Sequence, residues 1–204
     1  MVISFAFAMK TIIHFFVCSS LLFWNAGIAQ NNIDSSKVFT SLEEALKQPS
    51  AVYKLQLQHL SNHEIPDTIF TFGNLKWLDL SKNKLTDIPP EIGKLSKLEF
   101  LDVSRNKITS LPHTIANNNK LRILILNRNE IESLPKEIGE LQSLEILDLW
   151  SNEIDQLPQS ISQLKNLKKL DMRGINIPDS KQNSIQQLLP TAQIFFSAGC
   201  NCGK

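Results

Sequence analysis

The sequence predicts an α/β solenoid, in which short copies of one unit stack side by side around a shared core. The first observation is a block between Leu75 and Asn166 made of four in-phase copies, each 23 residues long. The copies read LKWLDLSKNKLTDIPPEIGKLSK, LEFLDVSRNKITSLPHTIANNNK, LRILILNRNEIESLPKEIGELQS and LEILDLWSNEIDQLPQSISQLKN. The second observation is that no copy can bury its apolar side alone, so neighbouring copies must cover each other.

Each copy begins with a short strand. Apolar residues occupy its first, fourth and sixth positions, and the fourth and sixth point to the same side of an extended chain. These residues are Leu75, Leu78, Leu80, Leu98, Leu101, Val103, Leu121, Leu124, Leu126, Leu144, Leu147 and Leu149. We therefore expect the fourth-position leucines to form one interior row.

An asparagine follows at the ninth position, where the strand turns inward: Asn83, Asn106, Asn129 and Asn152. A carboxamide can both donate hydrogen bonds to, and accept them from, loop backbone that water does not reach. We therefore predict a structural role for these four side chains.

The second half of each copy returns the chain to the start of the next strand. An aliphatic residue followed by proline ends the turn, because proline fixes φ and cannot donate to a sheet ladder. Aliphatic residues spaced by three then predict a short helical turn that faces the same core. Asn118 stands where the other copies have leucine, so we expect looser packing on the outer side of that copy.

This pattern resembles the leucine-rich repeat of the LxxLxLxxNxLxxLPxxIxxLxx type, found in bacterial and plant repeat proteins. The resemblance covers residues 52–194 and implies a horseshoe with about six parallel strands on its concave side. Such a hollow presents a binding surface and needs no cofactor. Because the scaffold hosts receptors, adhesins, inhibitors and regulators alike, the resemblance does not identify a partner.

We place the repeats at residues 52–174, with Val52–Asn74 as a divergent first copy in which Leu60 replaces the asparagine. A terminal copy has no neighbour on one side and needs a cover. We expect an N-terminal cap within residues 30–51, where a polar tail is followed by a helix with a capping box of Ser41 and Glu44.

The C-terminal cap is expected within residues 175–204. A closing helix should occupy residues 179–189, followed by a final short strand that contains Ile194 and Phe196. The tail carries Cys200 and Cys202, for which a labile disulfide is expected because one intervening residue makes a strained ring. An intermolecular bridge, or a soft metal held together with another chain, is the alternative.

Residues 1–29 have the pattern of a secretory signal peptide, with a lysine, an apolar run and small residues before Gln30. Met9 is the predicted initiator, because Met1–Ala8 would place Lys10 inside an apolar run. We expect an exported protein, periplasmic, on the cell surface or secreted, without a membrane span in the mature chain. An uncleaved anchor is the alternative.

The charge balance excludes partners bound by a strong overall field. The 204 residues carry a net charge of +1, and removal of the first 29 leaves 20 basic and 20 acidic side chains. This balance argues against nucleic acid as a partner.

Side chains between the buried leucines should face the hollow in columns. An apolar patch would then consist of Trp77, Phe100, Ile123, Ile125, Ile146 and Trp150, with a rim of Lys82, Arg105 and Arg128. Aromatic and arginine side chains are frequent anchors of protein interfaces. The other copies have Ser or Asn at the position of Trp150, so packing does not require an indole there. We predict a non-catalytic module that binds a protein or peptide ligand. The alternative for the isoleucines is that they only pack against one another across neighbouring strands.

Two other functions use the same surface. In a binder of envelope or extracellular glycans, Trp77 and Trp150 would stack on sugars beside Asp79 and Asp102. In a glycosidase-like enzyme, those two aspartates on adjacent strands would act as the carboxylate pair, but an open surface offers no pocket for a general acid. After residue 29 the histidines are His59, His63 and His113, and their placement predicts no metal site. The oligomeric state is not predicted.

Overall fold

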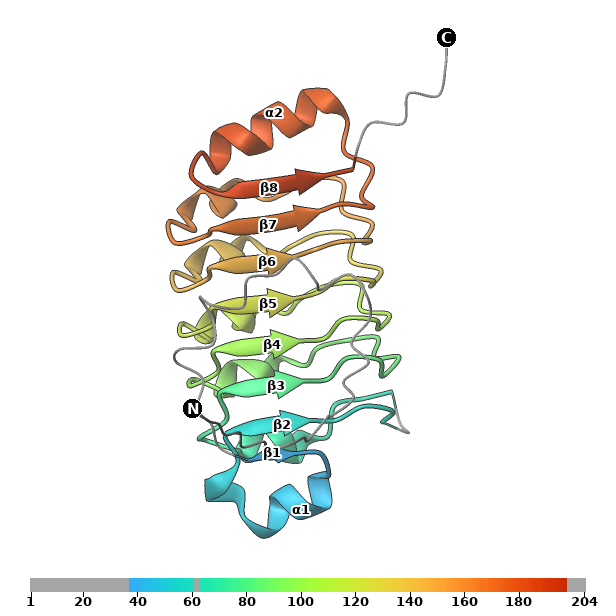
Figure 1. The fold of residues 1–204 in the computed structure, drawn as a ribbon, viewed down its shortest axis with the longest axis vertical. Coiled ribbons are helices and arrows are strands. Elements are labelled where there is room, and N and C mark those ends of the chain that lie inside the picture. The colour runs from blue at the N-terminus through green and yellow to red at the C-terminus, as the bar shows by residue number, and fades with distance from the viewer. Residues whose placement is uncertain (1–36, 61–62, 198–204) are drawn as a thin grey trace, which may run out of the picture. The chain divides into compact units, whose positions relative to one another are not determined.

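Eight parallel strands form one sheet in the computed structural model of the chain, and their order in the sheet follows the sequence (Figure 1). The structure describes residues 37–60 and 63–197, all within the unit Ile33–Lys204. The strands are β1 (Val38–Phe39), β2 (Lys54–Gln56), β3 (Trp77–Asp79), β4 (Phe100–Asp102), β5 (Ile123–Ile125), β6 (Ile146–Asp148), β7 (Lys169–Met172) and β8 (Gln193–Phe196). The sequence predicted about six strands in the repeats and the final strand, now β8, but not β1.

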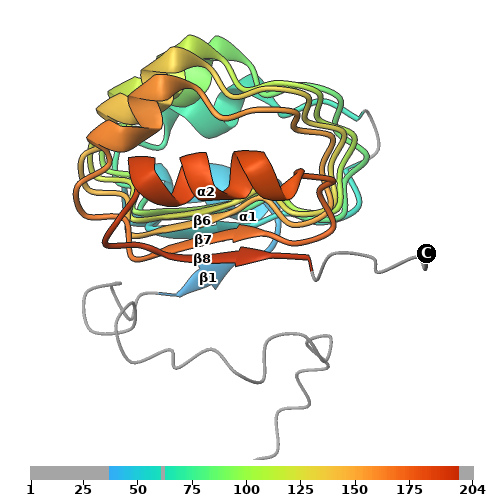
Figure 2. The ribbon, with the colours of Figure 1, turned by 90° about the horizontal axis from the view of Figure 1, so that it is seen from above.

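Short 3₁₀ helices return the chain between consecutive strands of the repeats. They are η1 (Pro49–Ala51), η2 (Asp67–Thr71), η3 (Pro90–Lys94), η4 (His113–Asn117), η5 (Lys136–Glu140) and η6 (Gln159–Gln163). Figure 2 shows these turns in one layer and the strands in another. From η2 onward the residue before each helix is the proline of the repeat, whose extended ψ turns the chain into the helix. The predicted helical turns are therefore present, in the tighter 3₁₀ form.

An α-helix lies next to the strands at each end of the described sheet (Figure 1). Helix α1 (Leu42–Lys47) begins after Ser41, whose hydroxyl accepts a hydrogen bond from the backbone N–H of Glu44 at 3.4 Å. Helix α2 (Asp179–Leu188) precedes β8. Strand β1 pairs with β2 and buries the ring of Phe39, which is 2% exposed.

The core is a stack of apolar rows, one from each position of the repeat. The strand register places Leu55, Leu78, Leu101, Leu124, Leu147 and Leu170 side by side, each fully buried. This is the interior row expected from the sequence. Since every copy covers the next, the row is continuous from β2 to β7.

A second row consists of the ninth-position asparagines, which hold the turns after the strands. The side-chain oxygen of Asn106 accepts hydrogen bonds from the backbone N–H groups of Asn83 and Leu85, both at 2.9 Å. Its amide donates to the carbonyls of Leu80 at 3.0 Å and Val103 at 2.8 Å. The asparagine thus pairs backbone groups of two copies, as the sequence predicted. In the divergent first copy, the backbone N–H of Leu60 donates to the side-chain oxygen of Asn83 at 2.7 Å.

The loose packing expected at Asn118 is not found. Its side chain is fully buried, and its amide donates to the carbonyls of Ile92 at 3.0 Å and Leu95 at 2.9 Å in the preceding copy. Each of these carbonyls also accepts a local backbone hydrogen bond, from Leu95 and Leu98, and its second lone pair accepts from Asn118. A polar residue can therefore replace leucine there. Asn118 therefore links two turns of the outer layer, although its own side-chain oxygen has no protein partner.

Candidate functional site

The face of the sheet turned away from the 3₁₀ helices is called the open face here. Third- and fifth-position side chains point to it, because they alternate with the buried fourth-position leucines. The register aligns the third position as Lys54, Trp77, Phe100, Ile123, Ile146, Lys169 and Gln193. The fifth position aligns as Gln56, Asp79, Asp102, Ile125, Asp148, Asp171 and Phe195.

Trp77 and Phe100 stack on each other across β3 and β4. Their ring centroids are 5.1 Å apart and their planes differ by 13°. This separation is close to the spacing of about 4.8 Å between neighbouring strands. The rings therefore stand side by side along the sheet, and each covers one face of the other. Both side chains are half-buried.

The isoleucines of the predicted patch contribute little accessible surface. Ile123 is 8% exposed and Ile125 is 6% exposed, whereas Ile146 is half-buried. Packing between neighbouring strands accounts for this burial, as in other cross-strand pairs. The accessible apolar surface of the patch is therefore mainly aromatic.

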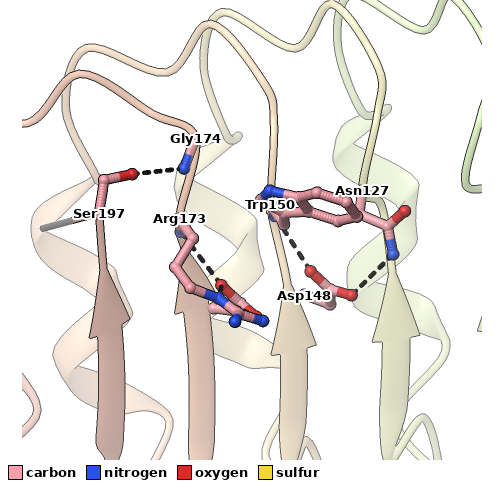
Figure 3. Close-up of polar contacts among 7 residues, drawn as sticks. Asn127, Asp148, Trp150, Arg173, Gly174 and Ser197 are labelled. Carbon is pink, nitrogen blue, oxygen red and sulfur yellow. Dashed lines mark hydrogen bonds and ion pairs between the residues drawn. The ribbon is translucent and has the colours of Figure 1, made fainter. Parts of the chain in front are cut away.

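Trp150 lies on the open face just beyond the end of β6, and not in the core (Figure 3). The guanidinium carbon of Arg128, from the preceding copy, is 4.5 Å from the centre of the indole ring. On the following copy, a Cβ atom at Gly174 would be only 3.2 Å from Cδ1 of Trp150. The missing side chain at Gly174 thus leaves room for the indole, a relation that the sequence analysis missed.

The aspartates of the fifth position hold the backbone where the strands end. Oδ1 of Asp79, Asp102, Asp148 and Asp171 accepts a hydrogen bond from the backbone N–H two residues later, at 2.8 to 3.0 Å. Oδ2 of Asp148 also accepts from the amide of Asn127 at 2.7 Å (Figure 3). Since these bonds are local and recur in each copy that has the aspartate, the column has a structural use.

Burial changes the acidity of two of these carboxyl groups. The pKa of Asp102 rises to about 6, first because burial disfavours the charged form and second because Asp79 lies on the adjacent strand. Burial also raises the pKa of Asp148, against the hydrogen bonds from the backbone of Trp150 and from Asn127. Asp102 stands on the open face of the sheet, and its Oδ1 accepts a hydrogen bond from the backbone N–H of Ser104.

A ladder of alternating charges runs along the amino ends of the strands, at the second position of each copy. Its members are Lys76, Glu99, Arg122, Glu145 and Lys168. Ion pairs join Lys76 to Glu99 at 3.6 Å, Arg122 to Glu145 at 2.6 Å and Lys168 to Glu145 at 2.6 Å. Burial alone would raise the pKa of Glu145, but hydrogen bonds from Lys168 and Arg122 outweigh it and lower the pKa. The alternating signs are visible in the sequence, yet the sequence analysis did not use them.

A shallow cavity of about 270 Å³ opens beside this ladder. Its lining is Arg122, Ser143, Glu145, Asn166 and Lys168. Arg122 and Lys168 already form ion pairs with Glu145, so these cations are not available to bind an anionic ligand in the cavity.

The basic rim, defined as Lys82, Arg105 and Arg128, lies at the opposite, carboxyl ends of the strands. All three residues have left-handed backbone, with φ of 62°, 56° and 56°. Their backbone N–H groups donate to backbone carbonyls of the next copy at 3.0, 2.9 and 2.8 Å. The hydrogen bonding between neighbouring copies therefore continues beyond the ends of the strands. No acidic side chain of residues 37–60 and 63–197 forms an ion pair with any of the three.

The remaining predicted positions lie elsewhere. His59, His63 and His113 are exposed, and in the described part of the chain no group of three or more His, Cys, Asp or Glu side chains is placed to hold a metal ion. Cys200, Cys202 and the signal segment lie outside the described residues. Among the helices that the structure does describe, none has the length and apolar character that a membrane span requires.

The chain is a repeat solenoid, because each copy contributes one strand to a parallel sheet, one 3₁₀ turn to the opposite layer, and buried leucine and asparagine side chains between them. Two family models match this part of the chain. The one described as leucine rich repeat matches residues 50–108 and 74–131, and the one described as leucine-rich repeat region matches residues 115–190. The chain belongs to the leucine-rich repeat family.

Solved structures agree with this assignment. A leucine-rich repeat protein of Leptospira interrogans is 31% identical, with a TM-score of 0.65, over 79% of this chain and 48% of that chain. The leucine-rich repeat ectodomain of the plant membrane receptor kinase GASSHO1/SCHENGEN3 from Arabidopsis thaliana is 33% identical, with a TM-score of 0.56, over 70% of this chain and 18% of that chain. That ectodomain was solved in complex with CASPARIAN STRIP INTEGRITY FACTOR 2. The chain thus spans about half the length of the first protein and under a fifth of the second. A search of curated proteins gives no match.

Proposed function

We propose that this chain is a non-catalytic interaction module that binds a protein or peptide on the open face of its sheet. The observation that carries the proposal is the half-burial of Trp77, Phe100 and Trp150, beside a core row in which every leucine is fully buried. Large aromatic side chains that remain accessible beside arginine are typical anchors of protein interfaces. Membership of the leucine-rich repeat family supports an interaction role, because its domains are generally interaction modules.

The orientation of the rings favours a protein ligand over a glycan. A sugar stacks on the face of an aromatic ring, and the contact between Trp77 and Phe100 covers one face of each ring. One face of Trp150 is covered by Arg128. The edges that remain suit apolar and aromatic side chains of a polypeptide.

An enzymatic function has less support. The carboxylates of Asp79 and Asp102 accept backbone hydrogen bonds, and Asp79 also accepts from the amide of Gln56 at 2.7 Å. A glycosidase needs one carboxyl group free to protonate the leaving group and a site that surrounds the sugar. We therefore propose no catalytic residue.

The test is an affinity capture with the full chain and two variants. Trp150→Ala should lose the captured protein, whereas Lys136→Ala, at an exposed position in the layer of 3₁₀ helices, should retain it. Equal capture by both variants would place binding elsewhere. A glycan array probed with the same three proteins separates the alternative, since binding to sugars that depends on Trp150 would contradict the protein ligand.

Export is a second part of the proposal and rests on the sequence of residues 1–29. Amino-terminal sequencing of the protein recovered from cells should begin at Gln30. Recovery of an intact segment would contradict cleavage there.

A further inference from the structure

We propose that the ligand of the open face is an acidic peptide segment, whose carboxylates bind to the basic rim of Lys82, Arg105 and Arg128. The inference rests on the proposed function, since it names the chemistry of the partner that this face would bind.

No side chain of the basic rim has an acidic partner within the described residues. Cations at the other end of the strands are paired, as Lys76, Arg122 and Lys168 are with Glu99 and Glu145. None of the three rim residues has an ion pair with residues 37–60 or 63–197. Asp79 and Asp102, three residues before Lys82 and Arg105, accept backbone N–H groups instead, and Ile125 stands three residues before Arg128. The rim therefore keeps its charge available for an external anion.

Folding does not account for cations at the three rim positions. The backbone there is left-handed, a conformation that favours glycine and asparagine over lysine and arginine. Gly174 occupies the same position of a later copy, with φ of 72°. A residue without a charged side chain thus satisfies the same backbone, and three successive cations indicate a use outside the fold.

Arg128 is the one rim residue whose side chain lies over an aromatic ring of the described residues. Its guanidinium lies over the indole of Trp150, whose ring attracts the cation, while Arg128 as a residue stays exposed. A planar guanidinium held in this way can donate two parallel hydrogen bonds to one carboxylate. Trp150 therefore acts as a positioning residue for the rim as well as an apolar anchor.

The spacing of the rim fits a peptide laid across the strands. Neighbouring rim residues are one strand spacing apart, or about 4.8 Å, so that the outer two are separated by roughly 10 Å. Acidic residues two or three apart in an extended segment are about 7 to 10 Å apart. Two carboxylates of one segment can therefore reach two rim cations, while its apolar side chains lie over Trp77 and Phe100.

A dense polyanion fits less well than a peptide. Asp79, Asp102 and Asp148 stand on the same face behind the rim, and their charges repel anionic groups placed there. A sulfated polysaccharide or a nucleic acid carries charge along its whole length, whereas a peptide can place two acids at the rim and apolar residues elsewhere. The arrangement thus selects for a segment of mixed acidic and apolar composition.

The experiment is a selection from a random twelve-residue peptide library, with the full chain immobilised. The rim variant is Lys82→Glu/Arg105→Glu/Arg128→Glu. The control variant is Lys94→Glu/Lys136→Glu/Lys165→Glu, which makes the same change in charge on the side of the 3₁₀ helices. Peptides selected by the wild type and by the control variant should be enriched in Asp and Glu, and the rim variant should lose that enrichment. For one selected peptide, Arg128→Gln and Trp150→Phe should each weaken binding by about tenfold or less, and the rim variant by more.

The outcomes separate this inference from the proposed function. Peptides selected without acidic enrichment, but dependent on Trp150, would overturn the acidic partner and leave the peptide-binding function intact. Failure to select any peptide above background would overturn the acidic peptide, and the affinity capture with Trp150→Ala then decides the proposed function. Equal loss of enrichment in the rim and control variants would show a general charge effect and contradict the rim. Binding of dextran sulfate in preference to the selected peptides would overturn the choice of a peptide. Circular dichroism and thermal unfolding of each variant show whether it is folded.

Discussion

The guanidinium carbon of Arg128 lies 4.5 Å from the centre of the Trp150 ring, although the two residues are 22 positions apart in the sequence. The contact joins the eighth position of one copy to the seventh position of the next. Because the backbone N–H of Arg128 also donates to the carbonyl of Trp150 at 2.8 Å, the two side chains are held at a fixed distance along the stack. Trp150 is thus part of a small built cluster on the open face.

The Arg128–Trp150 contact should be measurable as a coupling between the two residues. We expect a double-mutant cycle with Arg128→Ala and Trp150→Ala to give a coupling free energy of about 0.5 to 1 kcal/mol in urea unfolding. A cycle with Lys82→Ala and Trp150→Ala is the control, because those residues are three copies apart and their effects should be additive. Coupling of equal size in both cycles would mean that the effect is not local.

The row of ninth-position asparagines should contribute more to stability than any surface contact. Asn106→Ala removes five hydrogen bonds to the backbone and takes the acceptor from the buried N–H groups of Asn83 and Leu85. We expect a loss of about 3 to 5 kcal/mol in the free energy of unfolding. Asn119→Ala, at an exposed position, should change it by less than about 0.5 kcal/mol. Similar unfolding midpoints for the two variants would show that the hydrogen bonds of the asparagine row do not stabilise the fold.

The outer layer depends on close approach of neighbouring 3₁₀ turns. A Cβ atom at Gly139 would lie 2.3 Å from the carbonyl oxygen of Ser160 and 2.9 Å from Oε1 of Gln163. Because backbone must move to accommodate it, Gly139→Ala should destabilise the chain by about 1 to 3 kcal/mol. Gly73→Ala is the matched control, since nothing lies within 4 Å of its Cβ position. If thermal unfolding ranked the two variants in the opposite order, the turns would have to be more adaptable than their packing indicates.

Periodic features of the fold followed from the sequence, because each recurs at the same position of every copy. The row of leucines and the row of asparagines are such features, and the spacing within one copy was enough to predict where their side chains point. Features made between copies were missed. The contact of Arg128 with Trp150, the space at Gly174 and the bonds of Asn118 to the preceding turn all depend on how copies align, which spacing alone does not reveal.

The strand β1 and the burial of the isoleucines illustrate a second limit of the sequence. Val38 and Phe39 form too short a segment to show a strand period, and only pairing with β2 defines β1. Ile123 and Ile125 occupy positions that face the open side, but β5 has apolar residues at all of its positions, and its neighbours cover them. Columns can be predicted from spacing, whereas exposure within a column depends on the size of the neighbouring side chains.

The stability of the folded chain should depend on pH through Asp102. Its pKa of about 6 in the folded chain is above the ordinary value of 3.8, because burial and Asp79 disfavour its charged form. The folded chain therefore binds a proton more tightly than the unfolded chain, so that this stabilising contribution is complete below about pH 4 and is lost as the pH rises through 6. Asp102→Asn keeps the acceptor for the backbone of Ser104 and removes the charge. We expect the variant to match the wild type near pH 4 and to be more stable by on the order of 1 to 3 kcal/mol at pH 7.5.

Urea unfolding at four values of pH between 4 and 7.5 measures this difference, with Asp155→Asn as the control for removing one exposed carboxylate. A difference between wild type and Asp102→Asn that stays constant over this range would contradict the raised pKa.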